Sequence, residues 1–272
     1  MKRLIVNADD FGFTRDVNAG IIDAHTGGIL TATTLMANGD AFDDAVQLAH
    51  ANPSLDIGVH FVLIGGHSLL TQKPLPADLL SLVRAVYAGQ LDLYGELAAQ
   101  ANKIKAAGIS PSHADTHKHT HLLPPVCRAL VAIAEDFDIP FLRRPADLDL
   151  PFRAPLKTKL VNHFVRRLAR KMDPGPLRTT DHFAGFALTG RYDTTDLLAL
   201  FAKLPDGVTE WMTHPGRCTA ELLNAPTRLK QSRAVELQTL TAPQTRAALE
   251  NNQISLTRYR DLSELLSPPY PP

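Results

Sequence analysis

The chain has 272 residues, of which 28 are basic, 28 are acidic and 44% are hydrophobic. This length and apolar fraction are typical of one large α/β domain or two ordinary domains, and they exclude disordered and fibrous proteins. A net charge of zero argues against a general nucleic-acid-binding protein, which usually carries a basic surface. With only two cysteines, Cys127 and Cys218, the chain is neither a disulfide scaffold nor a cysteine-rich zinc module.

After Met1-Lys2-Arg3, a short apolar run, Leu4 to Val6, stops at Asn7. A secretory signal needs roughly 7–15 apolar residues, so this run is too short for one. The longest uncharged stretch, from Ile57 to Gln72, is interrupted by histidines and glycines and does not have the composition of a spanning helix. We therefore expect a cytoplasmic protein. Nothing in the composition predicts an oligomeric state.

Segments typical of strands alternate with segments of helical periodicity along the chain. Thr14 is predicted to cap a helix whose apolar residues Val17 and Ile21 share one face, and Gly27 is predicted to end it. Further helices are expected over residues 40–49, around Leu130 and over residues 193–204. The predicted strands are residues 3–7, 30–36, 56–62, 112–117, 139–143, 177–182, 208–213 and 254–258.

Alternating strands and helices predict a parallel sheet with crossover helices. Eight such strands in a chain of this length favour a closed (β/α) barrel, with an open doubly wound sheet as the alternative. We expect one domain over residues 1–266 and a loose proline-rich tail over residues 267–272.

The stretch from Pro151 to Met172 contains seven basic residues and no acidic residue. Leu156, Leu160, Phe164 and Leu168 lie along one side of it at helical spacing. One interpretation is a barrel helix or lid with a solvated basic face. The other is a segment that contacts an anionic surface such as lipid headgroups, at the inner face of the membrane.

Several predicted strands end in a side chain that can bind a metal or move a proton. Asp9 and Asp10 follow the first strand, His60 ends the third, Arg143 ends the fifth and His214 follows the seventh. In barrels and open α/β sheets, chemistry takes place at the carboxyl ends of the strands. Packing gives a core strand no reason to end in this way, so the recurrence predicts a functional site there.

The fourth strand opens a segment rich in histidine. Alternate residues of an extended strand share a face, so five titratable side chains would lie together while the segment stays extended: His113, Asp115, His117, His119 and His121. Burying them is costly unless a partner satisfies them, and a divalent cation binds neutral imidazoles and carboxylates. The strand is expected to turn into a loop soon after His117, so the later histidines should diverge.

Four ordered motifs resemble those of the YdjC-like carbohydrate deacetylases, a family that includes the chitooligosaccharide deacetylases. They are VNADDFG at residues 6–12, GVHF at 58–61, HADTH at 113–117 and MTHPG at 212–216. The sequence around them is also similar to the branch associated with hopanoid biosynthesis. The resemblance implies a distorted (β/α) barrel that uses one divalent metal to remove the N-acetyl group from an N-acetylglucosamine-type amino sugar, here on a soluble or a lipid-linked conjugate.

The resemblance also implies roles for individual residues. Asp10, His60 and His117 match the metal ligands of the family, Asp9 matches the general base, and His214 lies where related deacetylases keep a histidine acid. The ligand types favour zinc, whereas the family is commonly described with magnesium, so both ions stay open.

Further residues are expected to support this site. Asp115 is expected to orient a ligating imidazole, Glu210 to support His214 from the same strand face, and Arg143 to neutralise or orient Asp9. The candidates for contact with the sugar are Phe61, Asp181, His182 and Phe183.

Two alternative functions are open from the sequence. A metal-dependent phosphoesterase or amidohydrolase on the same barrel would use His119 and His121 as ligands of a second metal. A non-catalytic metal-binding barrel would have lost its base or its acid, whereas Asp9 and His214 are both present.

Overall fold

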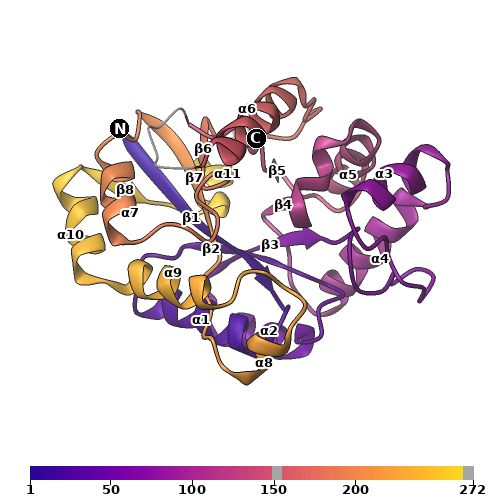
Figure 1. Cartoon of the computed structure of the whole chain (residues 1–272), viewed down its shortest axis with the longest axis horizontal. Coiled ribbons are helices and arrows are strands. Elements are labelled where there is room, and N and C mark those ends of the chain that lie inside the picture. Colours follow the sequence, from indigo (N-terminus) through magenta and orange to yellow (C-terminus); the bar gives the residue numbers. More distant parts are fainter. Residues whose placement is uncertain (149–154, 266–272) are drawn as a thin grey trace, which may run out of the picture.

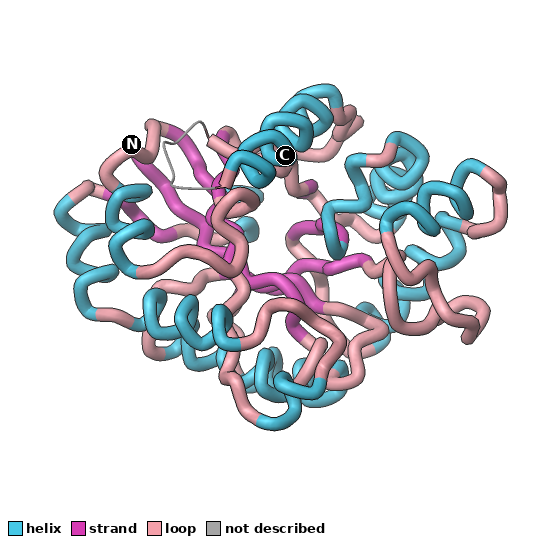
Figure 2. Tube along the Cα trace, viewed as in Figure 1, coloured by secondary structure: helices cyan, strands magenta, loops and turns pink. Residues whose placement is uncertain are grey.

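A computed structural model describes residues 1–148 and 155–265 of the chain (Figure 1). The predicted tail over residues 267–272 and residues 151–154 of the basic stretch lie outside the described residues. The strands curve through the middle of the molecule and the helices lie around them (Figure 2).

Eight parallel strands form one curled sheet, in the order β5-β4-β3-β2-β1-β7-β6, with β8 paired to the beginning of β1. Among the described residues, isolated bridges connect the two ends of this order: Phe141 of β5 with Arg178, and Asp147 with Phe183 of β6. The strands are β1 (Lys2–Phe11), β2 (Ala32–Leu35), β3 (Asp56–Phe61), β4 (His113–Thr116), β5 (Phe141–Leu142), β6 (His182–Ala184), β7 (Gly207–Thr213) and β8 (Ile254–Leu256). This arrangement confirms the predicted distorted (β/α) barrel, and every predicted strand overlaps an observed one.

The helices connect the strands in the expected alternation. Thr14 caps the first helix by accepting a hydrogen bond of 3.2 Å from the backbone of Val17, and Gly27 ends it, as predicted. The helices are α1 (Arg15–Thr26), α2 (Phe42–Ala51), α3 (Leu79–Tyr87), α4 (Leu93–Ala106), α5 (Pro124–Asp136), α6 (Leu156–Lys171), α7 (Thr194–Phe201), α8 (Ala220–Asn224), α9 (Gln231–Thr241), α10 (Pro243–Asn251) and α11 (Tyr259–Leu265), with a short 3₁₀ segment η1 (His117–Leu122). Among the described residues, no helix is both long enough and apolar enough to cross a bilayer.

The two faces of β1 enter different environments, because successive side chains of a strand alternate. Leu4 and Val6 pack in the main core beneath the helices. Ile5 points to the other face, where it joins a smaller apolar cluster inside the barrel with Ala32, Phe141, Val208, Tyr259 and Leu262. Asn7 and Asp9 follow Ile5 on the same face. The barrel interior is therefore apolar near the beginning of β1 and polar near its end.

Candidate metal and catalytic site

The end of β1 presents two consecutive carboxylates to the barrel interior. In a regular strand, Asp9 and Asp10 would point to opposite faces. The register of β1 against β2 shifts between Ala8 and Phe11, and Asp10 has a φ of 72°, in the left-handed region that aspartate tolerates better than most residues. This bulge turns Asp10 toward the interior as well, and both side chains are buried.

Three side chains from separate elements converge at one point: Asp10 of β1, His60 of β3 and His117 of η1. His60 Nε2 lies 3.4 Å and His117 Nδ1 lies 3.2 Å from Asp10 Oδ1, and the two nitrogens are 3.3 Å apart. Ligands held at about 2.1 Å from a tetrahedral ion are separated by about 3.4 Å. The spacing of the three atoms therefore fits a shared ion.

The chemistry of these donors also fits a metal. Asp10 Oδ1 is buried and accepts no hydrogen bond from the described residues. His60 Nδ1 lies 2.5 Å from Asp115 Oδ1, which places a proton on Nδ1 and leaves the lone pair of Nε2 facing Asp10 and His117. Thr34 donates a hydrogen bond of 3.3 Å to the other oxygen of Asp115 and so helps to hold that carboxylate in place.

The carboxylates around His60 favour a positive charge at this point. Burial alone would lower the pKa of His60, but Asp115, Asp10 and Asp9 outweigh it and raise that pKa to about 10. Burial alone would raise the pKa of Asp10, but Arg233 and the two imidazoles hold it well below its usual value. A proton on His60 or a bound divalent cation would compensate the negative charge of these carboxylates.

Arg143 lies at the centre of the remaining carboxylates and is only 1% exposed. Its Nη1 and Nη2 donate to the two oxygens of Asp9 at 2.8 and 2.7 Å, its Nε donates to Glu210 Oε1 at 2.7 Å, and it is also paired with Asp115. Burial alone would raise the pKa of Asp9, but Arg143 lowers it far below its usual value, so Asp9 is ionised at neutral pH. Burial raises the pKa of Glu210 to about 7 despite the contact with Arg143.

His214 follows β7, and its imidazole lies near the carboxylate of Asp9. Its Nε2 lies 3.8 Å from Asp9 Oδ2, and its backbone N–H donates to Glu236 Oε2 at 2.5 Å. Thr213 donates to the same oxygen at 2.9 Å, so Glu236 fixes the backbone on which His214 stands. Burial lowers the pKa of His214 against the opposing effect of Asp9, which favours the neutral imidazole at pH 7.

The sequence reasoning missed two charged residues of this site, Arg233 and Glu236, which are both 1% exposed on α9. Arg233 pairs with Asp10 Oδ2, the oxygen that faces away from the two histidines. An arginine and a glutamate three residues apart on a helix usually form an exposed ion pair. The sequence alone gives no reason to expect the buried arrangement of Arg233 and Glu236 in place of an exposed ion pair.

The charges of the cluster do not balance among the described residues. Its carboxyl groups are Asp9, Asp10, Asp115 and Glu210, and its guanidinium groups are Arg143 and Arg233. With Asp9, Asp10 and Asp115 ionised and Glu210, whose pKa is raised to about 7, protonated, one negative charge remains beside His60 in a buried place, where such a charge is costly. A proton on His60 or a bound cation would neutralise it.

The histidine-rich segment diverges after β4, as expected. Lys118 and His119 have φ values of 55° and 52°, and this left-handed pair turns the chain away from the strand direction. His113 hydrogen-bonds Asn7 and stacks on Tyr259, while His121 bonds Thr116. In the described part of the chain, His119 and His121 belong to no group of side chains spaced to hold an ion, so they do not form the second set of ligands that the alternative function requires of them.

The residues expected to contact the sugar are not brought together. The predicted strand over residues 177–182 would end in Asp181 and His182, but β6 begins at His182 instead. Asp181 accepts from the backbone of Val208 and His182 contacts the carbonyl of Asp206, so both lie near the beginning of β7, away from His214. Phe61 is fully buried in the core on the face of β3 opposite His60 and offers no exposed ring.

Phe183 is the member of this set that borders the cluster. Its ring lies 5.8 Å from the guanidinium carbon of Arg143 and 6.3 Å from the ring of His119. His119 also lies 5.4 Å from the ring of Phe186. The rings of Phe183 and Phe186 therefore both pack against His119, near the polar site.

The sequence profile of a family described as "YdjC-like protein" matches residues 3–251 of the chain. A carbohydrate deacetylase of Brevibacillus brevis is 31% identical over 269 residues, which cover 96% of this chain and 99% of that protein. A carbohydrate deacetylase of Geobacillus stearothermophilus is 32% identical over 273 residues, covering 96% and 98%. A mouse carbohydrate deacetylase is 31% identical over 296 residues, covering 96% and 94%.

A solved structure shares the fold. A crystal structure from Enterococcus faecalis, described as that of a candidate cellobiose-phosphate cleavage protein, superimposes with a TM-score of 0.74 at 25% identity. The match covers 96% of this chain and 98% of the other.

Proposed function

This chain belongs to the YdjC-like carbohydrate deacetylase family, and from that premise we propose that it is a metal-dependent enzyme that removes the N-acetyl group from an N-acetylglucosamine-type sugar. The observation that carries the proposal is the convergence of Asp10, His60 and His117 on one point, directly beside the ionised carboxylate of Asp9.

Asp10, His60 and His117 would hold the ion. A bound divalent cation polarises a carbonyl oxygen and lowers the pKa of water, which is the help that hydrolysis of an unreactive amide needs. Two imidazoles and one carboxylate favour zinc over magnesium, because magnesium prefers oxygen ligands. Arg233 would keep Asp10 oriented through the carboxylate oxygen that the ion does not use.

Asp9 and His214 would move the protons of the reaction. Asp9 is ionised and would accept a proton from the attacking water, while Arg143 holds the carboxylate in place through both oxygens. His214 is favoured in its neutral form, so it must gain a proton before it can protonate the departing amine. Asp9 Oδ2, 3.8 Å from His214 Nε2, is the neighbouring group from which that proton would come.

The sugar conjugate is the finer part of the proposal. An N-acetylglucosamine carried on a hopanoid glycolipid follows from the resemblance of the sequence around the motifs. Among residues 1–148 and 155–265, His119 and His121 do not extend the ligand set, so this part of the chain gives no observation that favours the phosphoesterase alternative.

The decisive experiment measures acetate release from N-acetylglucosaminyl lipids and from soluble chitooligosaccharides, before and after chelation. We expect turnover of at least one substrate class, its loss with chelator and its recovery on addition of zinc or another divalent ion. The variant Asp9→Asn serves as the matched inactive control, because it keeps the three proposed ligands. If neither substrate class releases acetate with any tested metal, the proposal is wrong.

A further inference from the structure

Helix α6 (Leu156–Lys171) carries a surface that the deacetylase site does not explain. Its inner side is formed by Val165 and Ala169, which are buried. Its outer side exposes four large apolar residues, with exposed fractions of 73% for Leu156, 63% for Leu160, 45% for Val161 and 60% for Phe164. Leu156, Leu160 and Phe164 recur every four residues and therefore form one row along the helix.

The charges of α6 all have one sign. The helix contains no acidic residue and six basic ones: Lys157, Lys159, Arg166, Arg167, Arg170 and Lys171. Arg167 and Lys171 continue the outward row of Leu156, Leu160 and Phe164 by their helical spacing. The apolar residues therefore lie on the outer side of the first half of α6. Most of the basic residues lie on the outer side of its second half and along one flank of the helix.

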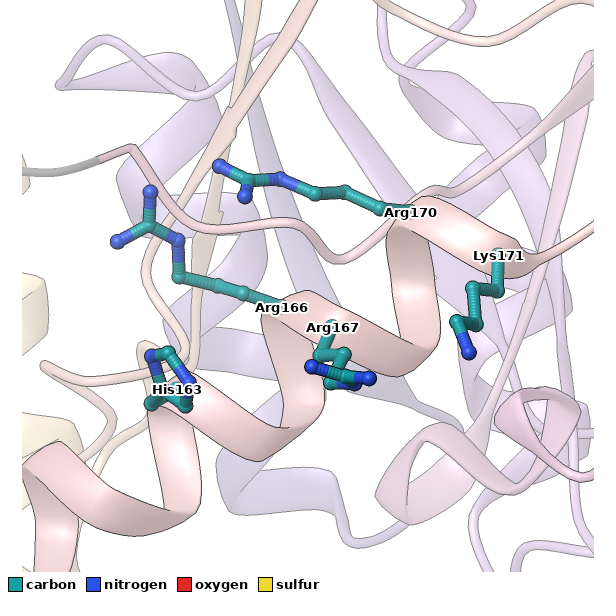
Figure 3. Close-up of a pocket in the computed structure, with 5 residues that line it drawn as sticks. All are labelled: His163, Arg166, Arg167, Arg170 and Lys171. Atoms are coloured by element: carbon teal, nitrogen blue, oxygen red, sulfur yellow. The ribbon is translucent and has the colours of Figure 1, made fainter.

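The basic half of the helix forms an open hollow of about 450 Å³ (Figure 3). It is lined by His163, Arg166, Arg167, Arg170 and Lys171, and Arg166 and Arg170 extend in the same direction. Arg166 and Arg170 also border a smaller hollow of about 270 Å³ with Asp147 and Asp181, so their flank is partly balanced by acids. Arg167 and Lys171 line only the first hollow.

The helix is held close to the catalytic site. Arg144, the neighbour of Arg143 in sequence, donates to the carbonyls of Ala169 and Arg170 at 3.0 and 2.9 Å. The helix also packs against η1, which contributes His117 to the proposed metal site. A surface that binds α6 would therefore lie beside the end of the barrel that holds the proposed metal site.

We propose that α6 docks the enzyme on the surface of an anionic lipid bilayer. A helix with exposed Leu and Phe beside clustered Lys and Arg fits the boundary between acyl chains and negatively charged headgroups. A soluble anion would use the basic hollow but not the apolar row. A second copy docked through the same surface would bring two sets of six positive charges together, which opposes the contact.

The docking itself does not depend on the enzymatic activity. Its consequence, that the site meets a sugar carried at the membrane surface, rests on the proposed deacetylase function. Binding is therefore measured without substrate, and turnover is measured separately on a soluble substrate. A failure of docking then leaves the proposed function untouched, and a failure of turnover leaves the docking result untouched.

The test is co-sedimentation of the full chain with vesicles of phosphatidylcholine alone and with vesicles that also contain phosphatidylglycerol. We expect at least about tenfold stronger partitioning to the anionic vesicles, and weakening at high salt. Arg167→Glu with Lys171→Glu, and separately Leu160→Ser with Phe164→Ser, should each reduce this partitioning by about tenfold or more.

Matched controls change the same side-chain types elsewhere on the surface. Leu79→Ser with Leu80→Ser alters two exposed leucines at the beginning of α3, and Lys203→Glu with Arg246→Glu alters two exposed basic residues; both should bind like the parent chain. Equal binding to both vesicle types, or equal binding by the α6 variants and their controls, would overturn the proposal. So would a loss of self-association in the Leu160→Ser, Phe164→Ser variant without a loss of vesicle binding, because it would identify a second copy as the partner.

Discussion

Asp9 and Asp10 are consecutive residues whose carboxylates are held by two different arginines. Arg143 of the β5 end binds both oxygens of Asp9, whereas Arg233 of α9 pairs with one oxygen of Asp10 and leaves the other facing His60 and His117. The left-handed backbone at Asp10 makes this division geometrically attainable. Two adjacent carboxylates can therefore take two separate roles, one toward a metal and one toward a proton.

The first prediction concerns the metal ligands. His60→Ala and His117→Ala should each abolish stoichiometric zinc binding and acetate release while leaving the circular-dichroism spectrum unchanged, because each removes one of three donors. His182→Ala, at the beginning of β6, should retain the metal and serves as the imidazole control. A His117→Ala protein that is free of metal and fully active would refute the ligand set.

The second prediction separates the two aspartates. Asp9→Asn should lower kcat by about 10²–10⁴-fold with metal content unchanged, since it removes a proton acceptor and no ligand. Asp10→Asn should instead lower metal content together with activity. Metal analysis and steady-state kinetics on the same preparations check both outcomes, and loss of metal from Asp9→Asn would contradict the division of roles.

A third prediction concerns Arg233, which the sequence did not single out. Arg233→Met should weaken zinc affinity by about 10–100-fold, because a ligating carboxylate loses the group that orients it. Competition with a chromogenic chelator measures the change. Arg246→Met, an exposed arginine on α10, is the matched control and should bind zinc like the parent chain. Equal affinity in the two variants would show that Arg233 does not act on the site.

A fourth prediction follows from the buried imidazole of His113. Burial lowers the pKa of His113 to about 4, below the value near 6.5 of the unfolded chain. The stabilising contribution of the neutral ring is therefore complete above pH 6.5 and is lost as the pH falls toward 4, by up to about 3 kcal/mol. An NMR titration should show no protonation of this ring between pH 8 and 5. A pKa of 6 or above for His113 would contradict its burial among Asn7, Ser112 and Tyr259.

The local pattern of apolar and turn residues is sufficient to locate most of the strands. Six of the eight lie within two residues of their observed bounds, because alternation of apolar runs and turn residues is a local property of the chain. The first strand runs on past its predicted end at residue 7 to Phe11, and the strand over residues 177–182 is displaced, since the observed strand begins at its last residue. Asp181 and His182 were expected at the carboxyl end of this strand, but they lie at the amino end of β6. They are therefore away from the proposed site.

By itself, the sequence determined the alternation of strands and helices, the barrel that follows from it, and the set of Asp and His residues at strand ends. Only the tertiary structure decided which of these side chains converge and which arginine holds each aspartate. The bulge at Asp10 depends on the pairing of β1 with β2. Arg233 and Glu236 reach the site from α9, and Arg233 lies more than two hundred residues after Asp10 in the sequence. Such contacts arise from the closure of the barrel and its helices, which is driven by the burial of apolar surface. The charges that this closure buries must be paired, and no local preference of the chain encodes which residues pair.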